Sequence, residues 1–207
     1  MPRAGNPPLS FHQQRLWFLN QLEPDNPNYN ISMAVRMAGK LNLGVLQQVL
    51  DAVVARHEVL RTTFAVEDEA PVQVVGDIKP VALPVTDLGQ RPGAGDEPAE
   101  VRVQRWLVAE TQRPFDLTKD LMLRASLVRL SEEEHILLLV THHIASDGWS
   151  TSVLFRELSE LYAAFSAGKP SPLPALPIQY ADYAVWQRQR FQGETAEAQL
   201  AYWRQQL

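Results

Sequence analysis

The feature that most constrains this chain is the segment at residues 121–143, LMLRASLVRLSEEEHILLLVTHH. Two apolar runs, each long enough for a strand, flank a charged stretch at residues 131–134 that is typical of a turn. The pattern predicts a long β-hairpin of two apolar strands. The fold must therefore contain an antiparallel sheet, and the other segments have to pack around it.

Helix and strand patterns alternate before this hairpin. Residues 9–24 predict a helix, because Ser10 can cap its amino end and Gln13 stands at the capping-box position. Residues 29–39 alternate apolar and polar side chains as a strand does. Residues 41–60 predict an amphipathic helix with a buried stripe of Leu46, Leu50, Val53 and Val54.

Shorter elements are expected between that helix and the hairpin. Residues 61–75 have the pattern of two strands around an acidic turn. Residues 81–88 predict a short strand, which its proline places at the edge of a sheet. Residues 97–112 predict a helix that carries Val101, Trp106 and Val108.

Helices are expected after the hairpin. One follows residue 150, ends at Gly168 and has an apolar stripe of Leu154, Leu158, Leu161 and Phe165. The proline-rich residues 169–177 predict an extended loop, and residues 178–191 and 195–207 predict two more helices. The whole order favours an α+β fold with a central, mainly antiparallel sheet flanked by helices. Because the last helical pattern has no cap, we expect the chain to be part of something longer.

The composition excludes several classes of function. The net charge of −5 gives no broad attraction to nucleic acid or to an anionic membrane. The chain has no cysteine, which excludes disulfides, thiolate catalysis and cysteine-based metal sites. Its first ten residues lack the apolar run of a secretion signal, and the longest apolar run, ILLLV, is too short to span a bilayer. We therefore expect a soluble, cytoplasmic protein.

Candidate chemistry gathers in VTHHIASDGWS, residues 140–150. On a strand, His142 and His143 point to opposite faces, so one faces inward and the other does not. If Gly148 supplies permissive backbone angles for a tight turn, Asp147 can fold back beneath the strand end. A histidine at the rim would then have a buried carboxylate nearby to orient it.

Four interpretations of this segment compete. The histidines can simply be satisfied polar residues at a strand end. A metal site is disfavoured, because adjacent strand histidines diverge and no third ligand has suitable spacing. A serine nucleophile is disfavoured as well, because no G-x-S-x-G elbow surrounds Ser146, Ser150 or Ser152. The fourth is a single histidine acting as acid or base on a nucleophile that the substrate brings.

Ordered motifs across the chain resemble those of the condensation domains of nonribosomal peptide synthetases. HHIASDGWS resembles their His-His-x-x-x-Asp-Gly signature, LSFHQQRLWFL their opening motif, RHEVLRTTF their second motif, and YADYAVWQ the motif after the signature. The resemblance implies a chloramphenicol-acetyltransferase-like fold, in which two lobes form a V around a tunnel. Only motifs of the N-terminal lobe are present.

This resemblance divides the chain into four parts. Residues 1–8 are an N-terminal extension, residues 9–168 the N-terminal lobe, and residues 169–177 the proline-rich loop. Residues 178–207 continue the lobe as helices and are truncated before the C-terminal lobe.

The implied activity is that of an amide-forming acyltransferase. A donor aminoacyl or peptidyl thioester on one peptidyl carrier protein is attacked by the amine of an acceptor thioester on another, with a lean toward L-donors and L-acceptors. The partner carriers deliver phosphopantetheine arms, and no cofactor or metal of the lobe itself is implied. The missing C-terminal lobe and an adjacent adenylation domain are the other expected partners, and the isolated lobe is expected to be inactive. A related coenzyme A acyltransferase and a non-catalytic docking half-domain are the alternatives.

The signature assigns roles to particular residues by resemblance. His143 takes the catalytic position, where it accepts a proton or holds the amine, and His142 is the inward, structural member. Asp147 is expected to be a buried structural carboxylate paired with Arg56 or Arg61.

Weaker expectations concern the surroundings of the signature. Gly148 is expected to be necessary for the turn, and Trp149 to pack under the loop or line the tunnel. Ser150 and His12 are weaker candidates for the substrate tunnel, and His12 replaces the small residue that is usual in the family. Tyr180, Tyr183 and Trp186 are expected to be core aromatics.

Overall fold

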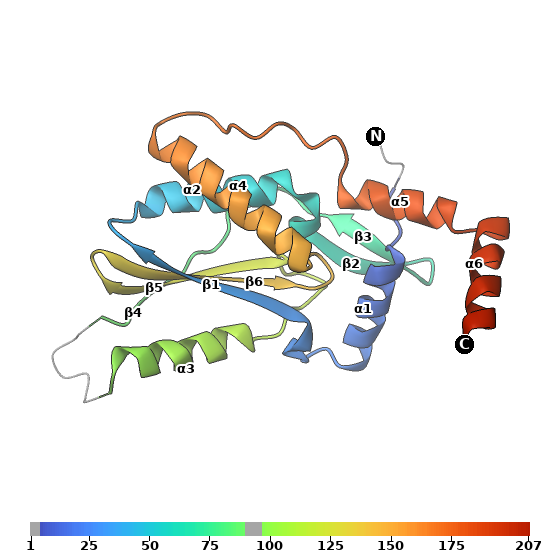
Figure 1. The fold of residues 1–207 in the computed structure, drawn as a ribbon, viewed down its shortest axis with the longest axis horizontal. Coiled ribbons are helices and arrows are strands. Elements are labelled where there is room, and N and C mark those ends of the chain that lie inside the picture. Colours follow the sequence, from blue (N-terminus) through green and yellow to red (C-terminus); the bar gives the residue numbers. More distant parts are fainter. Residues whose placement is uncertain (1–4, 90–96) are drawn as a thin grey trace.

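The computed structural model describes residues 5–89 and 97–207, which form a layered α+β structure (Figure 1). Within these residues the main sheet has the strand order β1-β6-β5-β4. The strands are β1 (Asn30–Ala38), β4 (Val85–Asp87), β5 (Leu123–Ser131) and β6 (Glu134–His142). β6 pairs antiparallel with both β1 and β5, so the predicted central hairpin is confirmed.

The predicted edge strand is also confirmed, since β4 ends the strand order. It pairs parallel with β5, which makes the sheet mixed at this edge. The predicted hairpin over residues 61–75 forms a separate ribbon of β2 (Thr62–Glu67) and β3 (Ala70–Val75).

Helices cover both faces of the main sheet. α2 (Leu43–Arg56) and α4 (Gly148–Ser166) lie on one face, and α3 (Ala99–Thr111) lies on the other (Figure 1). Both faces of β6 are therefore buried, which explains its continuous apolar sequence: Leu137 and Leu139 pack toward α2 and α4, whereas Leu138 and Val140 belong to a second cluster that includes Leu16.

The amphipathic stripe of α2 packs as its periodicity predicts. Leu46, Leu50, Val53 and Val54 are at most 4% exposed, and they share a cluster with Leu154 and Leu158 of α4. The helix predicted over residues 97–112 is confirmed as α3. Val101 and Val108 are 46% and 51% exposed, whereas Val103 is buried against the sheet. Periodicity allows either side of this helix to be buried, and the position of the sheet decides between them.

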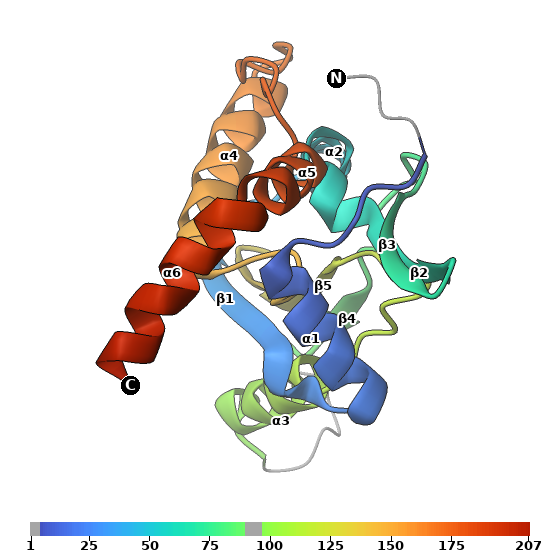
Figure 2. The same ribbon diagram turned by 90° about the vertical axis from the view of Figure 1, so that its right-hand side faces the viewer.

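The remaining helices lie at the end of the sheet where β6 stops. α1 (Phe11–Leu22) begins with the predicted capping box of Ser10 and Gln13. α5 (Tyr180–Arg190) crosses near the start of α1, and α6 (Gly193–Gln206) projects away from the layers (Figure 2). Short 3₁₀ turns, η1 (Pro27–Tyr29) and η2 (Glu58–Arg61), precede β1 and β2.

Hydrogen bonds join α5 to the segment at the start of α1. The hydroxyl groups of Ser10 and Tyr180 lie 3.0 Å apart. The Phe11 amide donates to Gln187 Oε1 at 2.9 Å, and Arg188 Nε donates to the Leu9 carbonyl at 2.8 Å. These bonds bring α5 to the end of the sheet where the two adjacent histidines lie.

Candidate active site

The two histidines lie where β6 gives way to a turn. His142 is the last residue of β6 and pairs with Asn30 of β1. The His143 amide donates to the Tyr29 carbonyl at 2.8 Å, and the Ala145 amide turns back to the His142 carbonyl at 2.9 Å. α4 begins three residues later, so the chain reverses direction directly beside the His143 side chain.

His142 is buried and electrically neutral at physiological pH. It is 2% exposed, and its ring contacts Phe115 edge-on with a centroid separation of 5.8 Å. Burial, with smaller effects from His143 and Arg124, lowers the pKa of His142 from 6.5 to about 4. Its Nδ1 accepts the Ile144 amide at 3.1 Å, and this bond fixes the turn that presents His143.

The hydrogen bond of His143 sets its tautomer. Its Nδ1 lies 3.0 Å from the Ser146 carbonyl oxygen. A carbonyl oxygen can only accept, so Nδ1 carries the proton, and in the neutral ring Nε2 keeps a lone pair. This is the state in which an imidazole can take a proton from a substrate.

Asp147 differs from the expected buried carboxylate. It is exposed and caps the amino end of α4, where Oδ1 accepts from the Ser150 amide at 2.7 Å and from the Ser150 hydroxyl at 2.6 Å. These two bonds are the main reason that its pKa lies below the ordinary value. The unpaired amide groups of the first helical turn satisfy the carboxylate locally.

The two candidate arginines bind elsewhere, which corrects the predicted Asp–Arg pair. Arg56 Nε lies 3.2 Å from Glu157 Oε1, and Arg56 Nη1 donates to the Pro174 carbonyl at 2.6 Å. Arg61 Nη1 donates to the Gly76 carbonyl. Both arginines therefore join structural elements and do not orient the signature aspartate.

Gly148 departs from expectation, and one of the two roles expected for Trp149 is excluded. Gly148 does not have a positive φ, and a Cβ built on it meets no atom within 4 Å, so the turn itself does not demand glycine. Trp149 is 82% exposed, hence it does not pack under the loop. It lies instead at the border of a cavity, together with Ser150.

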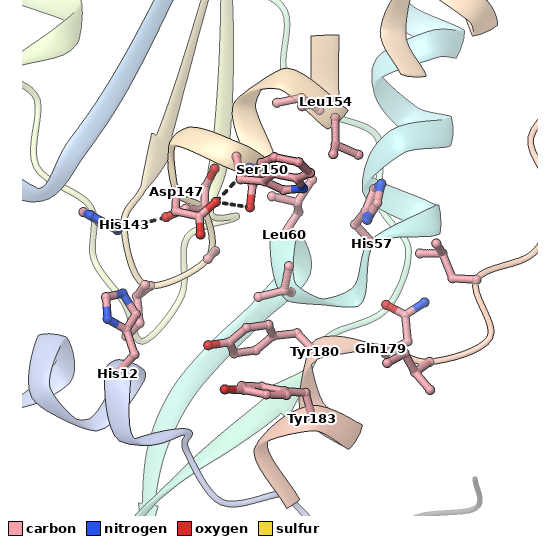
Figure 3. A pocket seen from close by; sticks show the side chains of 18 residues that line it. His12, His57, Leu60, His143, Asp147, Ser150, Leu154, Gln179, Tyr180 and Tyr183 are labelled. Carbon is pink, nitrogen blue, oxygen red and sulfur yellow. Dashed lines mark hydrogen bonds between the residues drawn. The ribbon is translucent and has the colours of Figure 1, made fainter. Parts of the chain in front are cut away.

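A cavity of about 430 Å³ lies beside His143 (Figure 3), and we call it the His143 cavity. Its walls come from α1, the turn after β6, the start of α4, η2 and residues 176–183. Residues that line it include His12, His57, Leu60, His143, Leu154 and Tyr180. Segments more than 160 residues apart in the sequence thus form a single site.

His12 lies closer to the candidate base than its place in the sequence suggests. Its ring centroid is 5.3 Å from that of His143, and its side chain hydrogen-bonds to the His143 backbone. Partial burial is the main cause that lowers the pKa of His12, against the opposing effect of that hydrogen bond. The site therefore holds two imidazoles, both lining the His143 cavity.

Sequence reasoning missed the far wall of this cavity. Tyr180 and Tyr183 line it, and Trp186 is 54% exposed, so the prediction that these three are core aromatics is wrong. His57 also lines the cavity, and its Nε2 lies 2.6 Å from Glu157 Oε2. No local pattern could have revealed these contacts, because their partners are about 100 or more residues away.

The described residues contain neither a membrane-spanning helix nor a cluster of metal ligands. Across residues 5–89 and 97–207, no helix is long and apolar enough to cross a membrane. In the same part of the chain, no three histidine, aspartate or glutamate side chains are grouped so that they could hold a metal ion.

Comparison with known sequences identifies relatives along the entire chain. A family model described as "Condensation domain" matches residues 3–207. A linear gramicidin synthase protein of Brevibacillus parabrevis is 45% identical over 207 residues, and chondramide synthase cmdD of Chondromyces crocatus is 45% identical over 208. Each match covers 100% of this chain, but only 3% and 5% of these relatives.

Solved structures share the fold. The X-domain from teicoplanin biosynthesis superimposes with a TM-score of 0.86 and 34% identity, covering 99% of this chain and 44% of that one. The starter condensation domain of rhizomide synthetase RzmA gives a TM-score of 0.84 at 24% identity, covering 99% and 48%. The predicted fold class is therefore confirmed, and the chain spans less than half of either solved structure.

Proposed function

The chain belongs to the condensation-domain family, and from that premise we propose that it is the N-terminal half of a domain that joins two carrier-bound substrates through an amide bond. The amine of an acceptor aminoacyl thioester attacks the carbonyl carbon of a donor aminoacyl or peptidyl thioester. A C–N bond forms and the C–S bond breaks. One proton leaves the amine, and the departing thiolate takes one up.

The observation that carries the proposal is the tautomer of His143. With Nδ1 donating to the Ser146 carbonyl, Nε2 can receive the proton that the amine must lose. Because the acceptor substrate supplies the nucleophile, the site needs no activated serine. Asp147 acts indirectly, by fixing the first turn of α4 next to the Ser146 carbonyl.

An amine is already a good nucleophile toward a thioester, so alignment of the two substrates contributes alongside proton transfer. The His143 cavity lies beside the reacting atoms on this half. The other wall of the tunnel belongs to the C-terminal half of the domain. Donor and acceptor peptidyl carrier proteins bring their phosphopantetheine arms to it, and an adenylation domain loads the acceptor carrier.

Changing His143 in the natural full-length protein tests the assignment. His143→Ala should lower the rate of dipeptide formation by about 10²–10⁴-fold, as expected when an acid–base group is lost. The loading of both carriers, followed by mass spectrometry, should stay at the wild-type level. Unchanged dipeptide formation in the alanine variant would remove His143 from the reaction.

A second variant separates proton transfer from alignment. His143→Gln keeps a hydrogen-bonding side chain of similar length but cannot take up a proton near neutral pH. If proton transfer dominates, the glutamine variant should be as slow as the alanine variant. A glutamine variant close to wild type would assign His143 to holding the amine and the tetrahedral intermediate.

A further inference from the structure

The His143 cavity is larger than proton transfer between two substrates requires. An apolar cavity of roughly 150 Å³ in a protein core is sufficient to hold benzene. The His143 cavity has about 430 Å³ and extends from His143 to His57 and Leu176. Space on this scale is typical of ligand pockets, which span roughly 300–1,000 Å³.

The side chains around this space are mainly apolar. Leu60 of η2, Val153 and Leu154 of α4, and Leu176 and Ile178 of the loop before α5 all line it. They come from three separate segments that meet only in the folded chain. A group that enters the cavity therefore leaves water for an apolar environment. For an apolar group this transfer is favourable.

Hydrogen bonds within the protein already engage three polar side chains of the lining: Gln179, Tyr180 and Ser150. The Gln179 side chain accepts the Glu58 amide at 3.1 Å and donates to the Arg56 carbonyl at 2.9 Å. The Tyr180 hydroxyl is bonded to Ser10, and the Ser150 hydroxyl to Asp147. A polar substrate group would have to break these bonds, which disfavours it relative to an apolar group.

The charges at the far end of the cavity are paired as well. His57 lines that end, and its Nε2 lies 2.6 Å from Glu157, whose side chain is only 5% exposed. Arg56 offsets the Glu157 charge at 3.2 Å. A charged substrate side chain would find no free counterion in this paired cluster and would lose its hydration.

We propose that the His143 cavity is a side-chain pocket that receives a large apolar group, aromatic or branched aliphatic, from one of the two condensing substrates. This proposal rests on the proposed function, because it places the reacting thioester or amine at His143. It assigns to the N-terminal half a part in choosing the substrate.

Filling the pocket provides the test. Val153 is a half-buried residue of α4 that lines the cavity, so Val153→Phe should occupy the space without disturbing a fully buried position. Ser152→Phe is the matched control, because Ser152 is the preceding residue of the same helix, is exposed and does not line the cavity. Both variants are made in the natural full-length protein with carriers loaded with alanine, leucine or phenylalanine.

Two substrate series reveal which partner uses the pocket. In one the donor side chain varies against a glycyl acceptor, and in the other the acceptor varies against a glycyl donor. In one of the two series, Val153→Phe should lower the phenylalanyl-to-alanyl ratio of kcat/KM by about tenfold or more, as misfit in an apolar pocket does. Ser152→Phe should leave that ratio unchanged.

A second filled variant and a binding measurement distinguish failure of the proposed function from failure of the pocket proposal. Ile178→Trp fills the cavity from the loop, outside any helix or strand, and should act as Val153→Phe does. Calorimetry should detect binding of phenylalaninamide to the wild-type protein, weaker binding of alaninamide, and loss of the difference in both filled variants. If no dipeptide forms with any substrate but this difference persists, the proposed function fails and the pocket stands. If condensation proceeds and both filled variants keep the wild-type ratio and binding, the pocket is refuted.

Discussion

His142 and His143 are adjacent in the chain but have opposite surroundings. The His142 ring is enclosed by Phe115 and Tyr29, whereas the His143 ring borders the cavity. Burial keeps His142 uncharged, and the Ser146 carbonyl keeps the proton of His143 on Nδ1. Strand alternation predicts that the two histidines separate, but it cannot say which environment each ring meets.

The buried histidine should make the fold sensitive to acid. In the unfolded chain His142 takes up a proton near pH 6.5, but in the folded protein only near pH 4. Between these values the unfolded state therefore binds more protons than the folded state. The contribution of His142 to the free energy of unfolding is complete above pH 6.5 and decreases as the pH falls toward 4. The loss should reach roughly 3 kcal/mol, measurable by urea unfolding across this range.

Replacing the ring isolates its contribution. His142→Asn should flatten the dependence of the unfolding free energy on pH between about 6.5 and 4, although it lowers stability at neutral pH. His12, whose pKa is also lowered by burial, contributes in the same direction and leaves a residual slope. A slope identical to that of the wild type would exclude His142 as its source.

The role of Asp147 as a helix cap leads to a modest stability effect. Asp147→Ala should lower the free energy of unfolding by about 1 kcal/mol, the usual cost of losing a side-chain cap. Asp147→Asn should retain most of the stability of the wild type, because the side-chain amide oxygen can still accept a hydrogen bond from the Ser150 amide. Denaturant titration of the two variants checks this, and a loss above about 3 kcal/mol would indicate a buried ionic partner after all.

At the scale of elements, Glu157 links α2 to α4. Its carboxylate contacts Arg56 and His57 at the end of α2, and its side chain is 5% exposed. Glu157→Ala should cost about 3–5 kcal/mol of unfolding free energy, because Arg56 would lose its buried partner.

Glu160, on the same helix, is the matched control. It is exposed and lies 4.0 Å from Arg156, so Glu160→Ala should change stability by at most about 0.5 kcal/mol. Thermal or chemical unfolding of both variants provides the comparison. Equal losses of unfolding free energy in the two variants would mean that burial does not determine how much each carboxylate contributes to stability.

The elements that sequence predicts best are those with an unambiguous period. The β5–β6 hairpin and the stripe of α2 follow from local patterns, and the structure confirms both. The buried side of α3 did not follow from the sequence, because the helix has apolar residues on more than one side. The Asp147–Arg pair was wrong because chemical complementarity says nothing about distance, and nearer donors exist in the first turn of α4. The cavity lay beyond prediction, since its walls come from distant segments.

At the scale of the whole molecule, large apolar side chains are exposed along α5, α6 and the loop before α5. Trp186, Tyr202 and Trp203 are 54%, 57% and 56% exposed, and Ile178 and Leu200 are exposed as well. Exposed apolar groups in such number usually mark an interaction surface. Under the proposed function, the C-terminal half of the domain is the partner that would cover part of it.

The 207-residue chain expressed alone should therefore self-associate and form no dipeptide from loaded carriers. Sedimentation over a range of concentrations should show species larger than a monomer, and Trp203→Glu should shift the distribution toward the monomer. A chain that remains monomeric at all concentrations would contradict the first expectation. Repeated turnover by the isolated chain would contradict the second.

The hydrogen bond between Ser10 and Tyr180 can form only late in the synthesis of the chain. The two residues are 170 positions apart, so at roughly 5–20 residues per second the ribosome needs on the order of 10–30 seconds to deliver the second after the first. During this interval α1 has no α5 to hold it. Once residue 143 has been made, the His143 turn can form before the far wall of its cavity exists. A nascent chain therefore carries an open, incomplete site, which closes only when Tyr180, Gln187 and Arg188 emerge to bind the segment that was made first.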